Sequence, residues 1–112
     1  MKTSDKQWLF LLDIAKLIQY ADTKGYKLTG GEAYRTMYQQ EKYLADGLSK
    51  TLDSQHLKRL AMDFNLFIDG DIQWNLSDEW KVLGAYWESL SKENEWGGNW
   101  RFLDVPHFQR ND

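Results

Sequence analysis

Two histidines are the only imidazole side chains in this sequence, and an aspartate stands near each of them. His56 precedes Asp63 by seven residues, and Asp104 precedes His107 by three. Two neutral imidazoles and one carboxylate form a recurrent catalytic zinc site that leaves a fourth position for water. Zinc lowers the pKa of that water to roughly 7, and a further carboxylate can carry its proton to a leaving amine. The residues therefore suggest a zinc hydrolase, in which Asp63 and Asp104 share the roles of ligand and general base.

Spacing alone leaves another interpretation open. A histidine followed by an aspartate seven residues later is also common on exposed surfaces that bind no metal. Pro106 redirects the chain between Asp104 and His107, so Asp104 could instead accept backbone hydrogen bonds in a turn. The neighbouring residues must therefore separate the two interpretations.

Length, charge and cysteine content exclude several classes of protein. The chain has 112 residues, no cysteine and a net charge of −3. This length fits a single domain over residues 1–112. The lack of cysteine excludes a disulfide framework, a thiol nucleophile and a cysteine-bearing zinc finger. The acidic balance argues against nucleic acid as the partner, because phosphate binding needs clustered Lys and Arg.

The apolar runs and the N-terminus predict a protein that does not insert into a membrane. No apolar run approaches the ~20 residues of a membrane span. Met1 to Phe10 lack the basic start, apolar centre and small-residue cleavage site of a signal peptide. We therefore expect a cytoplasmic product, which something else must release if its target lies outside the membrane.

Hydrophobic periodicity predicts three helices. The first begins with a capping box of Ser4 and Gln7 and ends at Gly25. Its expected buried stripe is Trp8, Leu11, Leu12, Ala15 and Ile18, widened by Leu9, Ile14, Leu17 and Ala21. A short helix is expected over 38–45, and a third should follow an N-cap at Ser77. Its helical stripe is Trp80, Leu83, Trp87 and Leu90.

Alternation at period two predicts strands between these helices. Residues 60–68 place Leu60, Met62, Phe64, Leu66 and Ile68 on one face and Asp63 on the other. The pair Asp69-Gly70 indicates a hairpin leading into Ile72 and Trp74. Further strands are expected within 26–34, where Gly30-Gly31 suggests a bulge or close approach, and in the second half of 96–108. The predicted fold is α+β, a small antiparallel sheet with helices packed on one side.

Two stretches of the sequence resemble the motifs of one enzyme family. Residues 54–63 read SQHLKRLAMD and resemble the S-x-H-x-x-x-x-A-x-D signature of the zinc D-alanyl-D-alanine carboxypeptidases, which include VanY-like and VanX-like peptidases. Residues 96–108 read WGGNWRFLDVPHF and look like the ending of the family's phage endolysin branch, whose members are L-alanyl-D-glutamate peptidases. The resemblance spans about residues 30–109 and implies a fold like that of the hedgehog and DD-peptidase domains.

The resemblance assigns chemical roles residue by residue. His56, Asp63 and His107 match the family's zinc ligands, so Zn²⁺ is the implied cofactor. Asp104 matches its catalytic acid/base, which is an aspartate in the endolysin branch and a glutamate in some relatives. The joint occurrence of the two motifs favours a zinc peptidase.

Two further residues match substrate-binding positions, and two depart from the family's pattern. Arg35 matches an arginine near the substrate carbonyl, where its donors suit a carboxylate or developing oxyanion; alternatively it is a surface cation at the start of a helix. Ser54 matches a substrate-contacting hydroxyl. Many relatives have glycine at the position of Arg59 and glutamate at that of Gln109, which leaves substrate contacts and support of the ligands less defined.

The aromatic tail can be interpreted in two ways. Trp96, Trp100 and Phe102 could form a carbohydrate-stacking platform, but such density near a sheet edge favours core or the wall of a cleft. The pair Gly97-Gly98 is expected to permit a tight backbone turn.

The resemblance implies a phage or prophage endolysin that hydrolyses the L-alanyl-D-glutamate bond of peptidoglycan stem peptides. The expected protein is a monomer without a separate cell-wall-binding domain, which waits in the host cytoplasm until a holin releases it. Two alternatives stay open. One is a D-alanyl-D-alanine carboxypeptidase or dipeptidase with the same metal and base, and the other is a family member that binds zinc or peptide without turnover. The bond cleaved, the host species, the oligomeric state and any second metal are not determined by the sequence.

Overall fold

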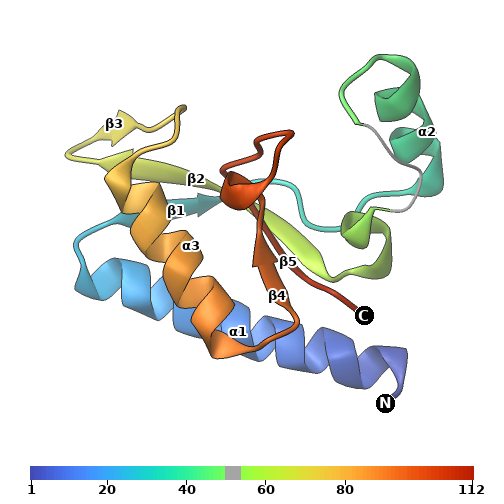
Figure 1. Cartoon of the computed structure of the whole chain (residues 1–112), viewed down its shortest axis with the longest axis horizontal. Helices are drawn as coiled ribbons and strands as arrows, with labels where there is room; N and C mark the ends of the chain where they lie inside the picture. Colours follow the sequence, from blue (N-terminus) through green and yellow to red (C-terminus); the bar gives the residue numbers. More distant parts are fainter. Residues whose placement is uncertain (50–53) are drawn as a thin grey trace.

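The computed structural model describes residues 1–49 and 54–112, and its centre is an antiparallel sheet (Figure 1). Strands β1, β2, β5 and β4 lie in that order, and β3 pairs with the far end of β2. The strands span Lys27–Gly30 (β1), Ala61–Ile68 (β2), Asp71–Ile72 (β3), Asn94–Trp96 (β4) and His107–Arg110 (β5). The predicted antiparallel α+β architecture is confirmed.

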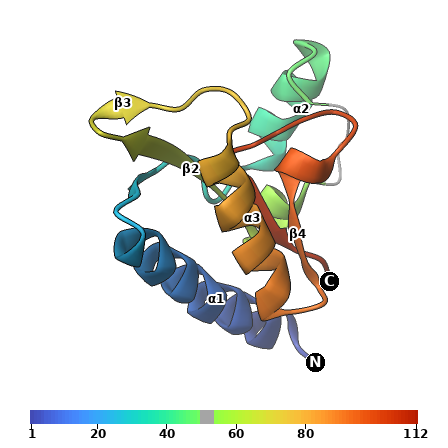
Figure 2. The same cartoon turned by 60° about the vertical axis from the view of Figure 1, so that its left-hand side comes forward.

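Two of the helices pack together against the sheet. α1 (Thr3–Thr23) and α3 (Asp78–Leu90) lie side by side in both views (Figures 1 and 2). α2 (Met37–Ala45) lies apart from them, beyond the end of the sheet where the 3₁₀ helix η1 (Gln55–Lys58) precedes β2. α2 is therefore an exception to the expected one-sided packing. Among the described residues, no helix is long and apolar enough to cross a membrane.

The core lies between the sheet and the two packed helices. Phe64, Leu66 and Phe108 from the sheet contact the predicted α3 stripe of Trp80, Leu83 and Trp87. Ser77 caps α3 as predicted, because its side chain accepts a hydrogen bond from the Trp80 backbone N–H. The face of β2 that carries Asp63 points away from this core, as the alternation predicted.

The predictions for α1 need two corrections. The helix begins before Ser4, because the Asp5 carboxylate accepts the Lys2 backbone N–H at 3.0 Å and closes the first turn. The buried apolar residues are Phe10, Ile14, Leu17 and Ala21. The last three belong to the predicted face and are confirmed, whereas Trp8, Leu11, Leu12 and Ile18, at its predicted centre, are exposed. Both sets have helical spacing, so periodicity did not identify the centre of the face that packs on the core.

Turn chemistry places the remaining strands. Asp69 and Gly70 both have positive φ, at 51° and 85°, as the predicted two-residue hairpin between β2 and β3 requires. Trp74 lies beyond β3 and is exposed. β4, between α3 and the aromatic tail, was not predicted, since it has only three residues.

Candidate metal centre

Strand pairing brings two of the predicted ligands together. Asp63 on β2 and His107 on β5 are directly opposite in the antiparallel register, where side chains on the same face are neighbours. His107 Nδ1 lies 3.2 Å from Asp63 Oδ1. His56 comes from η1, and its Nε2 lies 3.3 Å from the same Asp63 oxygen. One ligand atom of each residue lies within 4.8 Å of the others.

The orientation of His56 is set by the backbone around it. Its Nδ1 lies 2.7 Å from the Ala33 carbonyl oxygen, which only accepts, so Nδ1 carries the proton. Nε2 is then an electron-pair donor, and it is buried facing Asp63 without a hydrogen-bond partner among residues 1–49 and 54–112. A buried nitrogen lone pair that faces a carboxylate is unfavourable unless a cation lies between them. The His56, Asp63 and His107 side chains therefore fit a divalent metal ion.

The charges at the site keep Asp63 ionised. Burial acts to raise the pKa of Asp63, but its hydrogen bond with His107 and its interactions with the two imidazoles outweigh it and lower the pKa to about 2. For His107, burial acts to lower the pKa, while hydrogen bonds to Asp63 and Gln109 outweigh it, so the pKa is raised above 6.5. In the metal-free protein, a proton on His107 Nδ1 thus takes the place of a cation.

Asp104 lies beside the three clustered residues, on the loop that leads into β5. Its Oδ2 is 3.9 Å from His107 Nδ1, and burial raises its pKa despite the opposing charge of His107. The backbone N–H of Asp104 donates to the Gly97 carbonyl at 3.0 Å, and Asp104 O accepts from the His107 N–H at 3.2 Å. A Cβ on Gly97 would lie 2.2 Å from Asp104 O, so only glycine allows this approach. The predicted tight turn at Gly97 thus holds Asp104 near His107.

Arg35 is tied into a polar network rather than lying free on the surface. Its guanidinium pairs with Glu32, donates to Gln40 Oε1 at 2.6 Å and packs on the Tyr43 ring at 4.7 Å. Gln40 is fully buried, which makes this network rigid. The interpretation of Arg35 as a surface cation is therefore wrong. No sequence pattern indicated its partners, which come from α2 and from the irregular segment after β1.

Ser54 has a structural role at the start of η1. Its hydroxyl oxygen accepts the His56 backbone N–H at 3.2 Å and lies 3.4 Å from Arg35 Nη1. Ser54 thus joins the arginine to the histidine. Its predicted contact with substrate stays a prediction.

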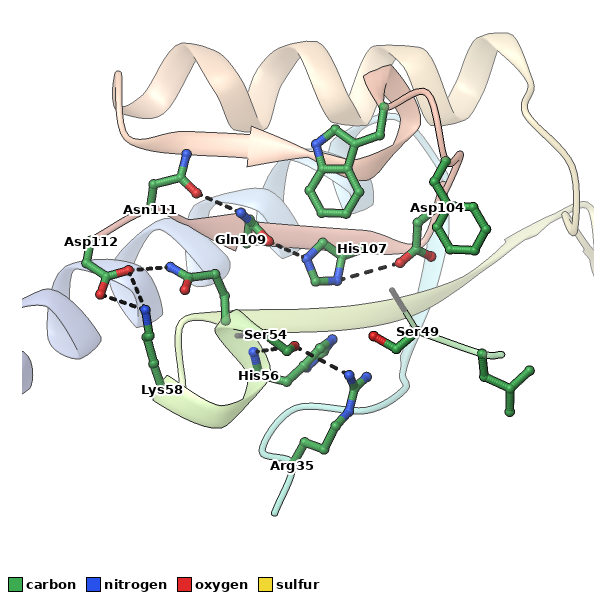
Figure 3. Close-up of a pocket in the computed structure, with 14 residues that line it drawn as sticks. Arg35, Ser49, Ser54, His56, Lys58, Asp104, His107, Gln109, Asn111 and Asp112 are labelled. Carbon is green, nitrogen blue, oxygen red and sulfur yellow. Dashed lines mark hydrogen bonds and ion pairs between the residues drawn. The ribbon is translucent and has the colours of Figure 1, made fainter. Parts of the chain in front are cut away.

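These side chains line one cleft of about 750 Å³ (Figure 3). Its walls include Arg35, Ser54, His56, Trp100, Asp104 and His107. Trp96 is buried in the core, whereas Trp100 and Phe102 line the cleft, which agrees with the preferred interpretation of these three residues. Sequence analysis missed the part played by Gln109, whose Oε1 lies 2.7 Å from His107 Nε2. The period-two spacing from His107 could have revealed it.

An open antiparallel sheet with a His–Asp–His cluster and an adjacent carboxylate is the arrangement used by mononuclear metal hydrolases. The chain belongs to the D-alanyl-D-alanine carboxypeptidase family, whose model matches residues 48–110, more than half of the chain. This confirms the family placement that the two motifs indicated.

Two relatives narrow the comparison. The L-alanyl-D-glutamate peptidase of Listeria phage A118 is 35% identical over 99 residues, which cover 86% of this chain and 34% of the relative. This chain thus spans about a third of the length of that curated relative. The crystal structure of the L-Ala D-Glu endopeptidase ChiX of Serratia marcescens superposes with a TM-score of 0.76 at 27% identity, over 91% of this chain and 77% of the other.

Proposed function

We propose that this protein is a zinc-dependent peptidase that hydrolyses the L-alanyl-D-glutamate bond in the stem peptides of bacterial peptidoglycan. The observation that carries the proposal is the convergence of His56, Asp63 and His107, whose two imidazoles line a cleft that also holds the Asp104 carboxylate. Both relatives are named for this bond, one from a phage and one from a bacterium. In this proposal His56 Nε2, His107 Nδ1 and the Asp63 carboxylate hold the ion.

In this proposal, each residue of the cleft has a separate role in hydrolysis. Zinc in this site would supply a Lewis acid and lower the pKa of water. Asp104 takes the proton from the attacking water and passes it to the leaving amine, a task suited to a half-buried carboxylate with a raised pKa. Arg35 directs its guanidinium toward the substrate carbonyl or a nearby carboxylate. Ser54 and Glu32 hold that arginine in place.

The first experiment is mass spectrometry of Gram-negative peptidoglycan digested with the purified protein, with and without a zinc chelator. Products with a new D-glutamyl amino terminus that disappear with chelator are expected. Release of free D-alanine would instead assign the carboxypeptidase activity that the family description names. No cleavage by a folded, zinc-loaded protein would leave the non-catalytic binding interpretation.

Asp104→Asn separates the proposed base from the proposed ligands. The variant should bind one zinc per chain, as the wild type does, and lose about 10²- to 10⁴-fold in cleavage rate, because the amide cannot accept the proton. Loss of zinc in this variant would contradict the role given to Asp104. His56→Ala should lose both zinc and cleavage.

We also propose how the protein reaches its substrate. One relative is a phage protein, which supports a role in lysis of the host wall. The protein would act as a monomeric catalytic domain over residues 1–112, held in the host cytoplasm until a holin opens the membrane. Cells that express it should lyse when a holin is co-expressed and stay intact without one.

A further inference from the structure

A chain of side-chain hydrogen bonds leads from His107 away from the metal centre, along β5 to β4. His107 Nε2 lies 2.7 Å from Gln109 Oε1, and Gln109 Nε2 donates to Asn111 Oδ1 at 2.6 Å (Figure 3). Asn111 Nδ2 then donates to Glu95 Oε2 at 2.8 Å. Gln109, Asn111 and Glu95 have no part in the reaction proposed above.

The chemistry at the far end fixes the direction of every bond in this chain. Trp100 Nε1, which can only donate, is bound to Glu95 Oε1 at 2.5 Å, and the Glu95 carboxylate can only accept. Asn111 must therefore turn its amide nitrogen toward Glu95 and its oxygen toward Gln109. Gln109 must in turn present its oxygen to His107, so the proton of neutral His107 belongs on Nε2.

We propose that Glu95, acting through Asn111 and Gln109, is a positioning residue that holds the His107 proton on Nε2 and leaves the Nδ1 electron pair free for the metal. This inference rests on the proposed metal site. The Trp100 ring also packs on His107, with centroids 4.9 Å apart, and so limits rotation of the imidazole. Trp100 thus both closes the hydrogen-bonded chain and holds the ring that the chain orients.

Glu95→Gln should reverse the donor and acceptor in each hydrogen bond between position 95 and His107, while the shape of the side chain at position 95 stays the same. Trp100 still needs an acceptor, so the new amide turns its oxygen to Trp100 and its nitrogen to Asn111. Asn111 and Gln109 then rotate in sequence, and Gln109 presents a donor to His107 Nε2. The His107 proton moves to Nδ1, the atom that faces Asp63. Zinc affinity, measured by competition with a chromophoric chelator, should fall about 10- to 100-fold.

Gln109→Glu provides the rescue that a purely structural role of Glu95 would not give. A carboxylate at position 109 can only accept, so the His107 proton stays on Nε2 whatever lies at position 95. Asn111 can now donate to the new carboxylate only if Glu95 is also replaced by glutamine. In the Gln109→Glu background, Glu95→Gln should therefore leave zinc affinity within about twofold, or improve it.

Glu93→Gln is the matched control, because it removes the same charge two residues from Glu95, and the Glu93 side chain accepts a hydrogen bond from Ser91. Only the Glu93 backbone carbonyl contacts Asn111, and the substitution leaves that carbonyl in place. It should leave zinc affinity within about twofold of wild type. The inference is overturned if Glu95→Gln has no effect, or if its effect is equal in both backgrounds.

The tautomer of metal-free His107 gives a readout that does not depend on zinc binding. Nitrogen-15 NMR of the imidazole at alkaline pH should show a larger fraction of the Nε2-protonated form in the wild type than in Glu95→Gln. Equal fractions would contradict the positioning role. If the two proteins differ in this way but the wild type binds no zinc, the proposed function is contradicted and the positioning of the His107 proton still holds.

Discussion

Arg59 stands where many relatives have glycine, and its backbone explains that preference. It ends η1 in the left-handed region, with φ 59° and ψ 35°. A non-glycine residue loses roughly 1–2 kcal/mol in this conformation. The guanidinium lies 4.1 Å from the centre of the Tyr34 ring, and such exposed contacts contribute about 0.5–1 kcal/mol. The ring contact thus offsets part of the backbone strain.

We therefore expect Arg59→Gly and Arg59→Ala to differ in stability. Arg59→Ala keeps the strained backbone and loses the ring contact, so it should be less stable than wild type by about 0.5–1 kcal/mol. Arg59→Gly loses the same contact but relieves the strain, and it should stay within about 1 kcal/mol of wild type. Urea denaturation of the metal-free proteins measures both. An alanine variant as stable as the glycine variant would contradict the strain argument.

The raised pKa of His107 predicts how zinc affinity depends on pH. Zinc must displace the proton that His107 Nδ1 shares with Asp63 in the metal-free protein. As the pH is lowered, zinc affinity should begin to fall while the pH is still above 6.5. It should then fall about tenfold for each further pH unit of acidification. Asp63, with a pKa of about 2, adds no proton over this range.

Calorimetric titration in two buffers of different ionisation enthalpy counts the protons released on zinc binding. About one proton per zinc should be released near pH 6, and fewer near pH 8. Zinc affinity that is constant between these values would mean that His107 is not protonated in the metal-free site.

At the scale of the elements, the 3₁₀ helix η2 (Gly97–Asn99) sets the position of Asp104. The Gly97 carbonyl accepts the backbone N–H groups of Trp100 and Asp104, and its Cα packs against the Asp104 carbonyl. Gly97→Ala must push the Asp104 loop outward. A displacement of about 1 Å can cost 10²-fold in rate, and we expect a loss of cleavage of that order.

Zinc affinity should change much less in Gly97→Ala, because His107 is held by its pairing with β2. Gly30→Ala is the control, since a Cβ there meets no atom within 4 Å. It should cleave peptide at the wild-type rate. Full activity of Gly97→Ala would show that the turn does not position the carboxylate.

The elements also show what could be predicted from the sequence. The alternation in 60–68 correctly placed Asp63 on the face opposite the core, because successive side chains of a strand point to only two faces. The same reasoning was only partly right for α1, which carries apolar residues on more than one face, so contact with α3 and β1 decides that Phe10 is buried while Trp8 is exposed.

The cross-strand pairing of Asp63 with His107 could not be read from spacing, because it depends on the register of strands 44 residues apart. The Glu95 contact with Asn111 likewise depends on β4, which is too short to have a periodic signature. The motifs therefore indicated the proposed ligands, whereas only the fold supplies the partners that orient them.

At the scale of the whole molecule, binding of the metal should raise the free energy of unfolding. The three proposed ligands come from η1, β2 and β5, so an ion bound to them links segments from the middle and the end of the chain. The His56 Nε2 lone pair and the Asp63 carboxylate face each other and oppose folding unless a cation lies between them, and a ligand that binds only the folded state stabilises that state. At a free zinc concentration of a hundred times the dissociation constant, this stabilisation is about 2.7 kcal/mol.

For a domain of this size, that stabilisation should raise the melting temperature by roughly 10 °C, which scanning calorimetry with and without chelator measures. Because the described residues share one core, we expect a single transition in both states. Asp104→Asn keeps the proposed ligands and should show the same shift as wild type, whereas His56→Ala should show almost none. A His56→Ala protein that zinc stabilises as strongly as wild type would place the ion elsewhere in the molecule. Loss of the shift in Asp104→Asn would make Asp104 a ligand rather than the base.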